Sequence, residues 1–242
     1  MMALTTVSEK IDDSTSRVFW ATGLKNSGIL DVSLDFAHED CALLAELIAL
    51  RYLLFKKKVF DREPGGGGGG GGGYRLTVSK GAIKKSANKK SSKKHAFKFS
   101  SFLTNRMNGV EIEVSQAKTI MPSIDDCEPE KIGGEKGVYA QTFDEITVPA
   151  IGRLFVTQHA VDQYQSRISS GAPKNPWASL VKRLSHPSLR VFPLDPKVLA
   201  HKARKYGRSD NVEAWSHPTS SFIYLVVRND DDERVLVTVF EL

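Results

Sequence analysis

One segment of this sequence concentrates side chains that can bind a polyanion. Eight lysines and no acids lie between positions 80 and 98: Lys80, Lys84, Lys85, Lys89, Lys90, Lys93, Lys94 and Lys98. Clustered lysines bind phosphate backbones by releasing condensed counterions, so we expect this run to contact RNA or DNA. Their spacing would place most of them on one side of a helix, if one forms. A solvated loop and an address signal for nuclear import are the alternatives.

The charge of the whole chain reflects this segment. The sequence has 34 Lys+Arg and 28 Asp+Glu, a formal net charge of +6. Taking the eight lysine charges from +6 leaves −2 for the rest of the chain. The basic character therefore belongs to one segment.

Several classes of protein are excluded on the same grounds. No apolar run approaches the roughly 20 residues of a membrane-spanning helix. Residues 1–15 lack the apolar region of a signal peptide. Two cysteines, Cys41 and Cys127, make neither a disulfide framework nor a multi-cysteine zinc site. We therefore expect a cytoplasmic protein with no membrane partner, no metal and no other cofactor.

Two stretches of the chain lack periodicity, and the second separates two domains. Residues 65–73 are nine consecutive glycines, which predict a flexible loop. A phosphate-binding loop would need a strand before it and a Lys-Ser/Thr helix start after it, whereas here a charged helix end precedes and a strand follows. Residues 118–149 are rich in Pro, Gly and acids, which predicts a linker. We expect a tail at 1–16 and domains at 17–117 and 150–242.

The N-terminal domain must position the lysine segment. We expect strands at 17–23, 29–36, 74–78 and 110–114, and a helix at 41–55. An apolar stripe on that helix is formed by Leu43, Leu47, Leu50 and Leu54. The domain is thus predicted to be α/β.

This order of elements resembles the ribonuclease H-like fold. The resemblance rests on residues 18–23 as the first strand and turn, 45–50 as the first helix, 76–81 as the fourth strand and 110–114 as the fifth. It covers about residues 17–115 and implies a mixed sheet. In such enzymes a basic segment after the fourth strand helps to grip the nucleic acid, and the lysine segment falls in a similar place.

The resemblance also implies a metal site that this sequence does not complete. Family enzymes hold two Mg²⁺ ions by carboxylates on the first strand, the first helix and the end of the fourth strand, because two dications need several anionic oxygens. Glu46 stands at the helix position, as a candidate catalytic residue. Thr22 or Ala21 replaces the first acid, and Ser79 or Lys80 the last. We expect no metal-dependent hydrolysis. The alternative for Glu46 is a solvated helix acid or a single structural hydrogen bond.

The C-terminal domain predicts an α+β pattern. We expect strands at 153–157, 212–215, 222–227 and 234–240, helices at 158–168 and 176–184, and a hairpin turn at 228–233. His159, Gln163 and Arg167 recur at intervals of four on the first helix and therefore share a face.

This pattern is similar to small bacterial domains of the RelE/BrnT toxin type, over about residues 151–242. The residues that carry the similarity are Thr157, His159, Ala160, Arg167, Tyr206, Trp215 and 237–239. Gln163 stands where an arginine is usual. Such toxins cleave RNA without metal, using groups that move protons and neutralise phosphate. The similarity makes His159 a candidate acid or base and Arg167 a phosphate ligand. A helix cap and a surface ion pair are their alternatives.

The leading hypothesis is a nucleic-acid-binding pseudo-nuclease, of the kind expected in plasmids, phages or other mobile elements. The first alternative is a metal-independent ribonuclease acting through the C-terminal domain. The second is an interaction adaptor whose apolar surfaces bind a protein partner.

Overall fold

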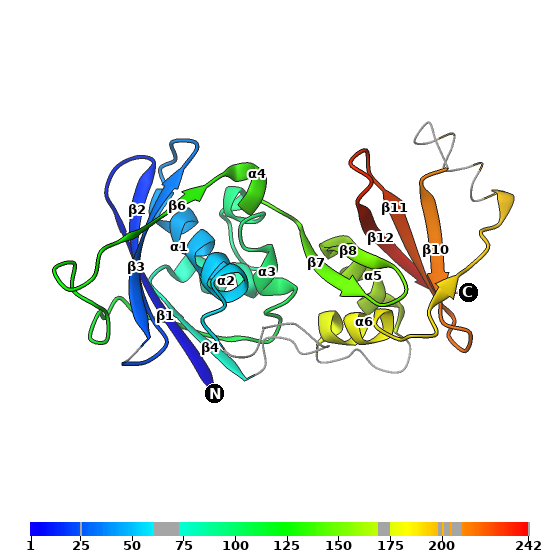
Figure 1. Cartoon of the computed structure of the whole chain (residues 1–242), viewed down its shortest axis with the longest axis horizontal. Helices are drawn as coiled ribbons and strands as arrows, with labels where there is room; N and C mark the ends of the chain where they lie inside the picture. Colours follow the sequence, from blue (N-terminus) through cyan, green and yellow to red (C-terminus); the bar gives the residue numbers. More distant parts are fainter. Residues whose placement is uncertain are drawn as a thin grey trace. The chain divides into compact units, whose positions relative to one another are not determined.

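The computed structural model describes residues 1–24, 26–60, 73–168, 175–197, 200, 204 and 210–241. The chain divides into two compact units, Met1–Thr142 and Phe143–Leu242. Each unit has a mixed β-sheet with helices packed against it (Figure 1), as expected for a mixed α/β protein. None of the helices in the described ranges is long and apolar enough to cross a membrane. Tyr206 and nearly all of the glycine run fall outside those ranges.

Unit 1 is built on a sheet with the strand order β5-β4-β1-β2-β3-β6. The strands are β1 (Met2–Lys10), β2 (Thr15–Ala21), β3 (Ser27–Leu34), β4 (Tyr74–Val78), β5 (Glu111–Val114) and β6 (Glu130–Gly134). The first three form an antiparallel meander. β4 runs parallel to β1, β5 parallel to β4, and β6 parallel to β3.

The helices of unit 1 follow the third, fourth and sixth strands. They are α1 (Cys41–Arg51), which continues into a π-helical turn (Tyr52–Lys56), α2 (Gly81–Ala87), a 3₁₀ turn (Lys94–Ala96), α3 (Ser101–Thr104) and α4 (Lys136–Tyr139). The predicted helix at 41–55 and strand at 74–78 are therefore confirmed.

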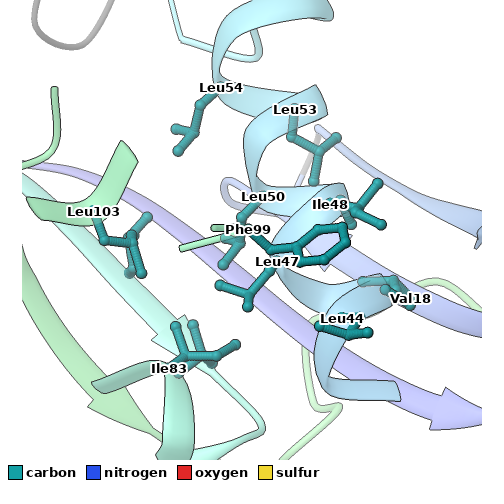
Figure 2. Close-up of a cluster of buried hydrophobic side chains, with 14 of the residues drawn as sticks. Val18, Leu44, Leu47, Ile48, Leu50, Leu53, Leu54, Ile83, Phe99 and Leu103 are labelled. Carbon is teal, nitrogen blue, oxygen red and sulfur yellow. The ribbon is translucent and has the colours of Figure 1, made fainter. Parts of the chain in front are cut away.

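The core of unit 1 surrounds α1. Leu44, Leu47 and Ile48 on this helix are at most 1% exposed. They belong to one cluster with Val18 from β2 and Ile83 from α2 (Figure 2). Because α1 is apolar around most of its circumference, removal of this surface from water stabilises the helix against the sheet. The one acid in α1, Glu46, is buried with it.

The predicted tail at residues 1–16 is wrong. Met2–Lys10 is β1, and it lies between β4 and β2 in the sheet. Thr6, Val7 and Ser8 are all buried. The hydroxyls of Thr6 and Ser8 find hydrogen-bond partners inside the fold, so a strand that looks polar in the sequence is interior. The strand expected at 17–23 is consequently β2, the second of the sheet.

The predicted linker at 118–149 also contains regular structure. It includes β6, α4 and β7 (Phe143–Val148), and the boundary between the units falls after Thr142. Gly134 allows β6 to approach the core, because a Cβ atom there would lie 2.9 Å from Leu34 Cδ2 and 3.1 Å from Ile48 Cδ1. Part of the expected linker thus completes the sheet of unit 1.

Unit 2 is a second sheet with the order β7-β8-β12-β11-β10-β9. Its other strands are β8 (Gly152–Thr157), β9 (Arg190–Val191), β10 (Val212–Ser216), β11 (Phe222–Arg228) and β12 (Arg234–Glu241). β8 and β12 are parallel, and the other neighbours are antiparallel. The predicted C-terminal hairpin is therefore confirmed.

Two helices cover the core of unit 2. They are α5 (Gln158–Arg167) and α6 (Pro176–Leu184). Tyr164 from α5 and Trp177 and Leu180 from α6 are fully buried in the cluster that joins these helices to the sheet. The helices predicted at 158–168 and 176–184 are therefore confirmed.

Candidate functional site

Glu46 is fully buried at a point where three elements of unit 1 meet. Its Oε1 accepts a hydrogen bond from Thr6 Oγ1 on β1 at 2.9 Å and from the backbone N–H of Ser79 at 2.6 Å. Its Oε2 accepts from Ser8 Oγ at 2.9 Å and from Ser79 Oγ at 2.6 Å. Ser79 directly follows β4, so the carboxylate joins α1 to the first and fourth strands.

The electrostatics of this site oppose metal binding. Burial raises the pKa of the Glu46 carboxyl, and the hydrogen bonds from Ser79, Thr6 and Ser8 act in the opposite direction. The hydrogen-bond partners of Glu46 in the described chain are hydroxyls and one N–H, and none is a second carboxylate. Because a pair of dications needs several anionic oxygens, this donor set does not fit the two-metal chemistry.

The geometry corrects two residue assignments made from sequence. Ala21 ends β2 and Thr22 follows it, so neither lies on the first strand, where Thr6 and Ser8 stand instead. Ser79 lies at the end of the fourth strand, as expected. Glu46 is not a solvated helix acid, and it has four hydrogen bonds rather than one.

The lysine segment that begins after Ser79 does not form one helix. α2 ends at Ala87, Lys89 has a positive φ of 56°, and a 3₁₀ turn follows. The exposed members are Lys84, Lys85, Lys89, Lys90, Lys94 and Lys98. Within the described ranges, no carboxylate pairs with Lys84, Lys85, Lys90, Lys94 or Lys98. These five ammonium groups are available to a polyanion.

The two lysines of the segment that are only partly exposed, Lys80 and Lys93, have internal partners. Lys80 is half-buried, and its Nζ donates to the backbone oxygen of Ser8 at 3.2 Å. Lys93 Nζ lies 2.7 Å from Asp40 Oδ2, next to the start of α1. The segment is therefore attached to the fold at both of these positions.

Two histidines join the contact between Lys93 and Asp40. His95 Nε2 lies 3.0 Å from Asp40 Oδ2 without hydrogen-bond alignment, and the His38 and His95 ring centroids are 4.3 Å apart. Lys93 is the main reason that the pKa of Asp40 is lowered. His38, Asp40 and His95 offer ligand atoms within 4.8 Å of one another, a donor set that zinc can use. The Lys93 ammonium already neutralises the carboxylate, so this cluster anchors the lysine segment.

In unit 2 the structure does not bring His159 and Arg167 to one point. His159 is exposed in the first turn of α5. Arg167 donates to the backbone and side-chain oxygens of Gln163 on the same helix. Eight helical residues separate them by about 12 Å along the axis. The N-cap of α5 is Thr157, whose Oγ1 accepts from Ala160 N at 3.1 Å. His159 is therefore not the cap, and the role of either residue in catalysis stays a prediction.

A cavity of about 370 Å³ in unit 2 gathers side chains that the sequence analysis does not select. Its polar lining includes Arg183, His186, His217, Thr219, Ser221 and Glu241. They come from the end of α6, the turn between β10 and β11, and the end of β12. A repeated tetrapeptide in the sequence could have indicated this site, because residues 185–188 are Ser-His-Pro-Ser and residues 216–219 are Ser-His-Pro-Thr.

Comparison of the chain with protein-family models, curated proteins and solved structures found no match. Functional inferences therefore rest on the residues of this chain.

Proposed function

We propose that this protein binds nucleic acid through the lysine segment of unit 1, and that unit 1 has no metal-dependent nuclease activity. The observation that carries the proposal is the group of five exposed lysines in the segment that begins after Ser79, none of which pairs with a carboxylate among the described residues. In the sequence they follow Ser79, which together with Thr6 and Ser8 donates hydroxyl hydrogen bonds to the buried Glu46 carboxylate.

The arrangement of unit 1 supports a ribonuclease H-like origin. Three antiparallel strands are followed by a helix, a fourth strand, further helices and a fifth strand, which is the order that the resemblance implies. Family enzymes carry their metal-binding acids on the first strand, the first helix and the end of the fourth strand. In this chain the same three places converge on Glu46, with Thr6, Ser8 and Ser79 supplying hydroxyls.

The loss of acids and the gain of lysines favour binding over hydrolysis. Without a second carboxylate the site lacks the charge to hold a pair of dications. A run of cations needs no metal to bind phosphate groups, because released counterions supply the free energy. Attachment of the segment through Lys80 and Lys93 keeps the exposed lysines beside the end of β4.

The binding half of the proposal is tested with a salt series. Fluorescence anisotropy of labelled RNA, DNA and RNA–DNA hybrid gives the slope of log affinity against log salt for the full chain. Replacing Lys84, Lys85, Lys90 and Lys94 together by Gln should reduce the slope for a single strand by about 3, because each phosphate contact contributes about 0.7.

A matched variant controls for net charge. Lys56, Lys58, Lys131 and Lys182 are also exposed and lie outside the segment, so replacing these four by Gln makes the same change in charge. The control should leave most of the slope intact. Equal slopes for the wild type and the segment variant, or equal losses in both variants, would overturn the assignment.

The second half of the proposal is tested by incubating labelled hybrid and RNA with Mg²⁺ or with EDTA. We expect the hybrid to remain intact with Mg²⁺. Metal-dependent cleavage that disappears in Glu46→Gln would contradict us. The EDTA arm also tests the alternative ribonuclease, because cleavage that persists without metal and is lost in His159→Ala would identify that activity in unit 2.

A further inference from the structure

We propose that the cavity of unit 2 is a phosphate-binding site, formed by Arg183, His186 and His217, that receives a phosphate group of the bound nucleic acid. The proposal rests on the proposed function for its biological ligand. The chemistry of the site follows from contacts within unit 2 alone.

The two histidines stand in duplicated turns. The backbone N–H of Ser188 donates to His186 Nδ1, and that of Thr219 donates to His217 Nδ1. Both donor–acceptor distances are 3.2 Å. In each case the donor is two residues after the histidine, within the repeated tetrapeptide. The ring centroids lie 4.3 Å apart at 83°, so the two turns bring their imidazoles into edge-to-face contact.

These contacts define where the imidazole protons are. An Nδ1 atom that accepts a hydrogen bond from a backbone N–H carries no proton, so a neutral ring holds its proton on Nε2. Both rings therefore present an N–H donor. Action as a general base through Nε2 would require a proton on Nδ1, opposite the backbone N–H. The geometry thus favours binding of an anion by His186 and His217 over proton abstraction.

Arg183 supplies the positive charge. Its Nε donates to Tyr164 Oη at 2.8 Å, and its guanidinium carbon lies 5.1 Å from the centre of the Phe222 ring. These contacts orient the planar group while the residue remains exposed. Among the described residues, no carboxylate pairs with Arg183. A fixed guanidinium without a counterion is a suitable partner for a phosphate, which it can bind through two N–H groups.

One acid also lines the cavity, and it provides an internal test. Glu241 is exposed and accepts a hydrogen bond from Ser221 Oγ at 2.7 Å. Its negative charge opposes an incoming anion at short range. Removing that charge should therefore strengthen phosphate binding, whereas removing a donor should weaken it. Damage to the fold would not produce a gain.

The cavity volume indicates how much of a ligand can enter. Sites for small molecules usually have volumes of about 300–1,000 Å³, and this one, at about 370 Å³, is at the lower limit. It has room for a phosphate and part of an attached nucleoside. The phosphate can belong to the end of a strand or to an internal diester, and the two sources are separated by experiment.

The test uses backbone amide NMR spectra of the full chain. The probes are inorganic phosphate, a 5′-phosphorylated RNA trinucleotide and its 5′-hydroxyl counterpart. We expect phosphate to shift the amides of Thr219 and Ser221. His217→Ala and Arg183→Gln should each weaken the affinity about tenfold, the effect of one charge-assisted hydrogen bond, and Glu241→Gln should increase it. Stronger binding of the 5′-phosphorylated probe would identify a strand end, and equal binding an internal phosphate.

Failure of this proposal is distinguishable from failure of the proposed function. The Gln variant of Lys84, Lys85, Lys90 and Lys94 should leave phosphate binding to the cavity unchanged. The cavity assignment is overturned if phosphate does not shift these amides, or if Glu241→Gln and His217→Ala both bind like the wild type. An unaltered salt slope in the lysine variant would contradict the proposed function alone.

Discussion

Ser79 donates hydrogen bonds to both oxygens of the Glu46 carboxylate, one from its backbone N–H and the other from its hydroxyl. Each donor–acceptor distance is 2.6 Å. Thr6 and Ser8 complete the set from the neighbouring strand. Because all four groups are buried, removing any partner would leave a polar atom without compensation. The buried Glu46 carboxylate is a structural junction between α1, β1 and the residue that follows β4.

Substituting Glu46 by Gln should change how stability depends on pH. Burial raises the pKa of Glu46 above its ordinary value of 4.5, so the folded state binds this proton more tightly than the unfolded chain does. The stability that this bound proton gives the folded state is fully present below pH 4.5, and it is lost as the pH rises through the folded-state pKa of Glu46. Relative to the wild type, Glu46→Gln should therefore gain stability over that pH range, as measured by hydrogen exchange of the α1 amides.

Glu46→Ala is the matched comparison for that prediction. It removes the acceptor of four hydrogen bonds, and we expect a loss of about 3 kcal/mol in the free energy of unfolding, because buried donors remain unsatisfied. A pH-independent difference between the wild type and Glu46→Gln would show that Glu46 does not titrate anomalously.

Adding an acidic side chain beside Glu46 should make the stability of the protein depend on a divalent metal ion. In EDTA, Ser8→Asp should lose about 3–5 kcal/mol, because it buries a second negative charge next to the first. Mg²⁺ or Mn²⁺ should restore part of that stability by binding between the two carboxylates. Ser8→Asn has a similar size without the charge, so it should not respond to metal. Thermal unfolding with and without metal gives the answer, and a metal response in both variants would refute the expectation.

Gly134→Ala should destabilise unit 1 by about 1–3 kcal/mol through overpacking, because the added methyl would lie 2.9 Å from Leu34 Cδ2 and 3.1 Å from Ile48 Cδ1. Gly137→Ala is the control, since nothing lies within 4 Å of a Cβ there. Combining Gly134→Ala with Ile48→Val removes one of the two clashing atoms and should recover part of the loss. Additive effects in denaturant unfolding would argue against the contact.

Asp40→Asn should release the lysine segment from the start of α1. The wild-type carboxyl has a lowered pKa, caused chiefly by Lys93, so its contribution is present above the ordinary pKa of 3.8 and is lost as the pH falls through the lowered value. We expect faster hydrogen exchange at Ala96 in the variant near neutral pH. The two proteins should converge in acid. Identical exchange at neutral pH would contradict the anchoring role.

The sequence by itself determined those regular elements whose apolar side chains repeat with a helical or strand period. The leucines of α1, the alternating residues of β4 and the amphipathic pattern of α6 each repeat with the period of the element they form, so their positions follow from local spacing. The acid-free lysine segment was equally visible, because charge along a chain needs no partner to be recognised. The repeated Ser-His-Pro-Ser/Thr tetrapeptide was also present in the sequence, although only the fold brings its two histidines into contact.

Tertiary structure alone decided which polar residues belong to the interior. Thr6 and Ser8 make the first strand look like a tail until Glu46, 40 and 38 residues away, accepts their hydrogen bonds. Arg183, His186 and His217 likewise share a cavity because a helix end and a strand turn meet in unit 2. A hydrogen bond forms between neighbours in space, and its net stabilisation depends on burial of both partners. Neither the spatial proximity of the partners nor their burial can be inferred from the local order of residues, so these sites could be identified only from the tertiary structure.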